Sequence, residues 1–191
     1  MIVYWLMYLI PVYAALTPIR VDQKTNSFSF SFFGIFVVFI IGFRYEVGGD
    51  WISYNNYYNQ ISELSLEQVL NFHETGYALL NWVSIKYNLG IYGVNLFSAS
   101  VFTYGIIKFC RTQPYPWLSL GISMPFTGVV VAMGYTRQSI AIGIILSIFF
   151  LFIAEVKIIG TSGICLNLSL ISFLIFCKIS VSIRSILLST I

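Results

Sequence analysis

The chain has 191 residues, of which 58% are hydrophobic and only 9% are charged, and its formal net charge is +3. A soluble domain of this size needs more polar surface than these residues supply, which excludes an ordinary soluble fold. The ten basic residues are dispersed along the sequence, which excludes a basic nucleic-acid-binding patch. Composition therefore predicts an all-α, multi-pass transmembrane protein, with the lipid bilayer as its surroundings.

Apolar runs divide the chain into expected spans, because crossing a hydrocarbon core takes roughly 20 helical residues. These runs cover residues 2–18, 28–43, 90–108, 117–133, 138–154 and 158–177. The piece 75–88 is moderately apolar and too short to span. The first run lacks a basic leader and a small-residue cleavage site, which predicts a retained helix rather than a signal peptide.

Lysine and arginine residues in short loops predict the orientation, because they gather on the cytoplasmic side of a membrane. Five of the ten lie in the loops 20–24, 108–111 and 155–157, which should therefore be cytoplasmic. Residues 44–74, called the outer loop below, hold one basic residue and five acidic ones, so this loop should face outward. Counting spans places the turn at Arg137 on the same outer side, provided that 75–88 does not cross.

The outer loop is predicted to be a structured cap rather than a slack linker. Gly48-Gly49 breaks the chain, and Asp50 is a good N-cap for a helix that begins at Trp51. Large side chains then share one face, as expected for a helix lying at the lipid–water boundary: Trp51, Tyr54, Tyr58 and Ile61. A second short helix is predicted to begin at Ser65, with a capping box.

Two arginines near the outer loop each allow two interpretations. Arg137 has apolar runs on both sides, and it either ends a helix and reaches the head groups or clamps a phosphate with its bidentate fork. Arg44 and Asp50 flank the Gly-Gly turn. They are either a border arginine and an N-cap, or a pair in which Arg44 binds an anionic group while Asp50 orients it or acts on a hydroxyl.

His73 and Glu74 are neighbours, and either side chain is a candidate general base. The ordinary alternatives are an interfacial histidine and an acid that caps a helix. Tyr54, Tyr57 and Tyr58 are expected to anchor the cap at the interface or to offer rings for stacking on sugars. One histidine cannot build a metal site with the ligands present, so no metal is expected.

Three short segments stand in a set order: Arg44-Tyr-Glu-Val-Gly48-Gly-Asp50 followed by Tyr54, then Glu74-Thr-Gly76-Tyr77, then Gly134-Tyr-Thr-Arg137-Gln138. They resemble, in turn, the Arg-x-x-x-Gly-x-Asp…Tyr signature, the Glu-x-Gly-aromatic segment and the Arg-Gln motif of the EpsG family. That family consists of multi-pass bacterial membrane proteins grouped with Wzy-type polysaccharide polymerases.

The resemblance implies a glycosyltransferase that polymerises exopolysaccharide, capsule or O-antigen repeat units on the outer face of the bacterial cytoplasmic (inner) membrane. The donor it implies is an undecaprenyl-pyrophosphate-linked oligosaccharide, with no metal or other cofactor, and other polysaccharide-assembly membrane proteins are expected partners. Carried over by motif, the substrate-binding residues are Arg44, Arg137, Gln138 and Tyr54. Asp50 and Glu74, with His73 beside them, would position or deprotonate the acceptor hydroxyl.

The chain departs from the family pattern in its last part. Family members are longer and carry a His-Lys/Arg-Ser-Ala-like motif in the outer loop that follows the Arg-Gln helix, and nothing after Ala154 resembles it. Aromatic residues also become scarce there. We therefore expect an EpsG-like region, residues 1–153, and a divergent hydrophobic tail, residues 154–191, as in a truncated or frameshifted member that could be inactive alone.

The alternative from another class is a non-enzymatic membrane component of polysaccharide export or transport. A transporter of lipid-linked oligosaccharides needs more spans and more intramembrane charge than this sequence offers. A metal-dependent membrane hydrolase, the third option, lacks the ligands.

Overall fold

The computed structural model describes residues 2–17, 22–72 and 74–158 of the chain. Two compact units divide the sequence, Met1–Ile148 and Phe149–Ile191. All residues of the site described below lie in the first unit. His73, the expected run 158–177 beyond its first residue and most of the predicted tail fall outside the described residues.

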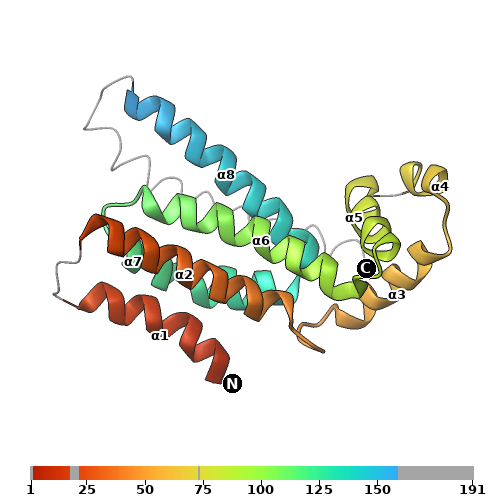
Figure 1. The fold of residues 1–191 in the computed structure, drawn as a ribbon, viewed down its shortest axis with the longest axis horizontal. Helices are drawn as coiled ribbons and strands as arrows, with labels where there is room; N and C mark the ends of the chain where they lie inside the picture. The colour runs from red at the N-terminus through yellow and green to blue at the C-terminus, as the bar shows by residue number, and fades with distance from the viewer. Residues whose placement is uncertain (1, 18–21, 73, 159–191) are drawn as a thin grey trace. The chain divides into compact units, whose positions relative to one another are not determined.

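Every regular element in the described residues is a helix, which confirms the all-α prediction (Figure 1). The helices are α1 (Ile2–Leu16), α2 (Gln23–Gly42), α3 (Trp51–Ser62), α4 (Leu66–Leu70), α5 (Thr75–Lys86), α6 (Gly90–Arg111), α7 (Pro116–Ser123), the π-helix η1 (Met124–Ala132) and α8 (Thr136–Ile158). Residues 155–157, predicted as a loop, continue α8 instead.

Two of the described helices are long and apolar enough to cross a membrane: Lys24–Gly42 and Gly90–Arg111. Three further apolar stretches are shorter: Ile2–Leu16, Pro116–Ala132 and Thr136–Phe149. The two long helices, α2 and α6, lie side by side and run antiparallel (Figure 1). Gly42 packs against Leu96 at one end of the pair, and Arg111 donates to the Ser27 carbonyl at the other.

Helices α6 and α8 approach each other closely enough for their backbones to touch. A Cβ atom at Gly105 would lie 2.3 Å from the carbonyl oxygen of Gly143, and one at Gly143 would lie 2.5 Å from that of Val101. Small residues at such crossings are typical of membrane helices, where close van der Waals packing replaces the hydrophobic effect. This contact holds the N-terminal part of α8, and with it Arg137, against α6.

The apolar run 117–133, predicted as one helix, is built as α7 followed by the nine-residue π-helix η1. Pro125 lies in the first turn of η1 and has no N–H to donate, so the regular α-helical ladder is interrupted there. The wider turns of a π-helix often occur next to functional sites. Here the turn that leads into the Arg-Gln motif follows η1 directly.

Helices α3, α4 and α5, called the cap below, have a small core of their own. Ile61, Val69 and Ala78 are fully buried at its centre. The structure confirms that α3 begins at Trp51 and that α4 has its capping box, in which the Ser65 N–H donates to the Gln68 side chain over 2.8 Å.

The prediction that this face of α3 lies at the lipid–water boundary is wrong. Tyr54 is 7% exposed and Ile61 is 0% exposed, so this face packs into the protein. A helix that packs on α5 has the same spacing of apolar residues as one that lies on a bilayer, and periodicity cannot separate the two. Asp50 stands at the N-cap position of α3, but its side chain makes no capping hydrogen bond.

Candidate functional site

Arg44 follows the C-terminal end of α2 and is buried, with 5% of its surface exposed. Its Nη1 donates to the backbone carbonyls of Ala132, at 3.1 Å, and Met133, and its Nη2 donates to the Thr136 hydroxyl. A guanidinium among the last carbonyls of a helix is favoured both by these hydrogen bonds and by the helix dipole. Arg44 therefore ties the end of α2 to the end of η1 and the start of α8.

This placement differs from that of a ligand-binding arginine. Two of the three guanidinium nitrogens of Arg44 donate to the protein itself, and Nε is buried without a partner. Burial lowers the pKa of the guanidinium from its ordinary value, although an arginine stays charged in proteins. The expected contact with a pyrophosphate would require these bonds to break, so the arrangement favours a positioning role for Arg44.

Gly48 brings the first family motif against the backbone of the third. Its φ is +101°, and a Cβ there would lie 2.9 Å from the carbonyl oxygens of both Met133 and Gly134. Only glycine satisfies both the conformation and the space. A Cβ at Gly49 would lie in open space, so the close backbone contact requires glycine only at position 48.

We expect Gly48→Ala to lower the amount of folded protein, since a strained backbone conformation costs about 1–3 kcal/mol and the added methyl group also meets two carbonyls. The matched control is Gly49→Ala, which adds the same methyl group to open space. Thermal unfolding of the detergent-purified variants measures the difference. Equal stability of the two variants would contradict the packing of Gly48 on residues 133–134.

Arg137, in the first turn of α8, forms an ion pair with Glu74 at the start of α5. The distance from Arg137 Nη1 to Glu74 Oε2 is 2.5 Å, and the two side chains are 37% and 41% exposed. Glu74 has a φ of +61°, a left-handed conformation that is uncommon for a residue with a side chain. It stands at the N-cap position of α5 without capping the helix through its carboxylate. The left-handed residue presents its carboxylate to Arg137 instead.

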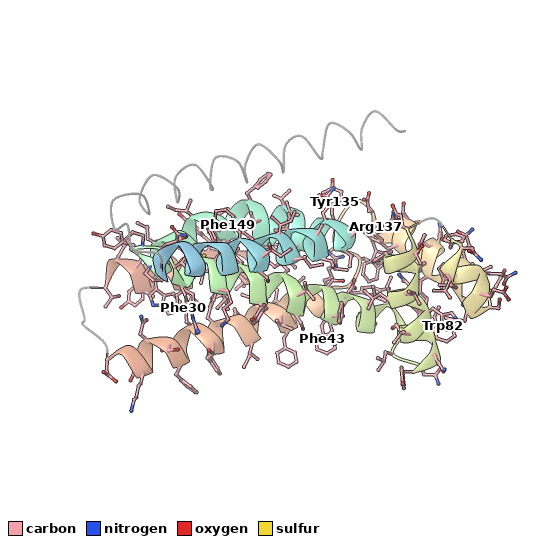
Figure 2. All side chains as sticks on the ribbon, turned by 90° about the horizontal axis from the view of Figure 1, so that it is seen from above. Phe30, Phe43, Trp82, Tyr135, Arg137 and Phe149 are labelled. Carbon is pink, nitrogen blue, oxygen red and sulfur yellow. The ribbon has the colours of Figure 1, made fainter. Side chains whose placement is uncertain are left out.

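Arg137 lies next to the cap (Figure 2). Its guanidinium contacts the rings of three tyrosines of the cap, called the tyrosine box below. Its central carbon lies 5.0 Å from the ring centroid of Tyr57, 5.2 Å from that of Tyr77 and 5.4 Å from that of Tyr54. Cation–π attraction over such distances holds an arginine in place. Burial raises the pKa of Tyr54 and of Tyr77, so both phenols stay neutral at physiological pH.

The other expected site residues lie around this centre. Asp50 is half-buried at the start of α3, where its backbone carbonyl accepts from the Tyr54 N–H over 2.9 Å and its carboxylate makes no capping hydrogen bond. Burial is the main cause of the raised pKa of Tyr54, and the negative charge of Asp50 raises it further. Gln138 is half-buried in the first turn of α8. His73 falls outside the described residues.

Two parts of the site are missing from the sequence-based expectation. Tyr77 belongs to the box, and its place in the Glu-x-Gly-aromatic segment is a signal that could have identified it. Asn95 of α6 is 3% exposed, and its Oδ1 accepts a hydrogen bond from the Thr136 hydroxyl over 3.5 Å. A carboxamide inside an apolar run is costly in a membrane, and this cost marks Asn95 as a residue of interest.

No group of three or more His, Cys, Asp or Glu side chains among the described residues is placed to hold a metal ion. A cavity of about 1000 Å³ lies between α1, α2 and Trp117. Its lining is almost entirely apolar and includes none of the site residues named above.

The comparison with known proteins gives one match. Residues 27–190 match the model of the EpsG family, a range that contains all three motifs and does not stop at residue 153. No curated protein and no solved structure gives a significant match. The matched range covers most of the chain. The chain therefore belongs to the EpsG family and is a membrane protein of polysaccharide biosynthesis.

Proposed function

We propose that this chain is a polysaccharide polymerase that transfers a growing glycan from undecaprenyl pyrophosphate to the hydroxyl of a lipid-linked acceptor. The observation that carries the proposal is the Arg137–Glu74 pair in the tyrosine box. It sets an anion-binding fork and a carboxylate next to each other, with neutral aromatic rings around them. Aromatic faces and adjacent hydrogen-bonding groups suit a sugar linked to a phosphate.

In the proposed reaction the acceptor hydroxyl oxygen attacks the anomeric carbon of the donor glycan. The new carbon–oxygen bond forms as the bond from that carbon to the pyrophosphate breaks, and the hydroxyl proton passes to the Glu74 carboxylate. Undecaprenyl pyrophosphate leaves with the bonding electrons, and Arg137 stabilises the charge that develops on it. Asp50 and Gln138 orient the sugars, and Arg44 positions the turn that carries Arg137.

The site is proposed to face outward from a multi-pass protein in the bacterial cytoplasmic membrane. Lys108 and Arg111 lie in the last turn of α6, at the end of the helix pair away from Arg44, and basic residues favour the cytoplasmic side. Arg44 itself reaches residues 132–136, so the two family arginines lie at the same end of the helices. This contact supports the expectation that 75–88 does not cross the membrane.

Labelling of single cysteines from outside the cell checks this orientation. We expect a membrane-impermeant thiol reagent to label a cysteine at position 60, an exposed position of α3, and to spare one at position 112, after α6. Both variants need the native cysteines replaced. Labelling of both positions, or of position 112 alone, would contradict the proposed orientation.

The proposed activity is tested by deletion of the gene from a strain that still makes repeat units. The polymerase predicts that single lipid-linked repeat units accumulate on the outer leaflet, because export continues while linkage stops. Accumulation on the inner leaflet would favour the alternative, a component of transport. Restoration of polymer by the full chain completes the test.

A further inference from the structure

The Arg137–Glu74 pair occupies both groups that the proposed reaction needs. Arg137 holds the carboxylate that is to act as the base, and Glu74 holds the guanidinium that is to bind the pyrophosphate. The Arg137 fork matches a carboxylate and a phosphate equally well in geometry, so the nitrogen that donates to Glu74 cannot also serve a phosphate at full strength. A donor pyrophosphate and Glu74 therefore compete for Arg137.

The pair is built so that its separation costs little. Both side chains are partly exposed, at 37% and 41%, and an ion pair in contact with water changes an equilibrium constant by less than about fivefold. Among the described residues, Arg137 is the hydrogen-bonding partner of the Glu74 carboxylate. A pyrophosphate carries more charge and more acceptor oxygens than a single carboxylate, and it is the stronger competitor.

The two partners differ in what holds them after separation. The tyrosine box keeps the Arg137 guanidinium 5.0–5.4 Å from three ring centroids, and neutral rings do not compete for its hydrogen-bonding fork. Glu74 lacks such support, because its carboxylate does not cap α5. An incoming anion would therefore leave Arg137 in place and displace Glu74.

We propose that the Arg137–Glu74 pair is an exchange site, in which the pyrophosphate of the donor displaces Glu74 and thereby frees its carboxylate for the acceptor hydroxyl. This inference rests on the proposed function, and it adds an order to it: the donor binds first, and donor binding unmasks the base. Glu74 also acts as an internal competitor that keeps weakly charged anions off Arg137.

The test is the affinity of the full-length, detergent-purified chain for farnesyl pyrophosphate, a short prenyl pyrophosphate used as the probe. Glu74→Gln removes the competitor and a repelling charge, so we expect it to bind the probe about threefold to tenfold more tightly while polymer formation in cells is lost. The matched control is Glu67→Gln, which removes the same charge from an exposed position on α4 and should bind like the wild type.

The outcomes separate the exchange from the proposed function. Binding by Glu74→Gln that equals or falls below that of the wild type, while Arg137→Ala no longer binds, would overturn the exchange and leave the donor site standing. A wild type that binds the probe no better than Arg137→Ala would overturn both. If Glu74→Gln does not fold, Glu74→Asp serves instead: its shorter carboxylate weakens the pair, and tighter probe binding is again expected, whereas unchanged or weaker binding overturns the exchange.

Discussion

Arg137→Ala is expected to abolish polymer in a cell that lacks its own polymerase, with the amount of membrane-inserted protein unchanged. The Arg137 side chain is 37% exposed and makes its ion pair at the surface of the cap, so its removal leaves little buried damage. Loss of a group that stabilises developing charge lowers a rate by about 10²–10³-fold. Immunoblotting for protein and gel electrophoresis of the glycan measure the two effects separately.

The control for this variant is Arg111→Ala. Arg111 is also exposed, and it donates to the Ser27 carbonyl and the Ser31 hydroxyl at the other end of the helix pair. It lies far from the cap along α6, so polymer should be retained at close to the normal level. Normal polymer from Arg137→Ala would remove this residue from the site.

Arg44→Ala is expected to lower the stability of the folded protein. The substitution leaves the carbonyls of Ala132 and Met133 and the hydroxyl of Thr136 without their donor in a buried place. Each buried acceptor that is left without its donor costs about 1–3 kcal/mol. Thermal unfolding in detergent should show a large loss, and Arg44→Lys should recover only part of it, because one ammonium cannot reproduce the planar fork.

The same variant distinguishes two roles for Arg44. A positioning residue predicts that stability and polymer fall together. Wild-type stability with loss of farnesyl pyrophosphate binding would instead make Arg44 a direct ligand of the donor, as the family resemblance implies.

Much of the cap could be predicted from the sequence, because local signals determine it. Asp50 and the preceding glycines mark the start of α3 at Trp51, and the Ser65–Gln68 spacing marks α4. The face of α3 that turns inward could not be predicted, since burial against α5 and contact with lipid produce the same apolar spacing. The π-helical form of residues 124–132 is hidden for a similar reason within an unbroken apolar run.

The members of the site are visible in the sequence, but their pairing is not. Arg137 and Glu74 are separated by 63 positions, and no local pattern predicts that their side chains meet. Both Arg44 and Arg137 are arginines at helix borders. Arg44 is buried among backbone carbonyls, whereas Arg137 lies in the tyrosine box. Arg44 contacts residues that lie 88 or more positions away in the sequence. Such tertiary contacts, which no local pattern reveals, give the two arginines their separate roles.

The most direct test of the central claim is reconstitution of the purified full chain in liposomes with undecaprenyl-pyrophosphate-linked repeat units. The proposed polymerase predicts glycans longer than one repeat, with one undecaprenyl pyrophosphate released for each link formed and neither product from Arg137→Ala. An absence of linked repeats, or release of undecaprenyl pyrophosphate without linkage, would contradict it.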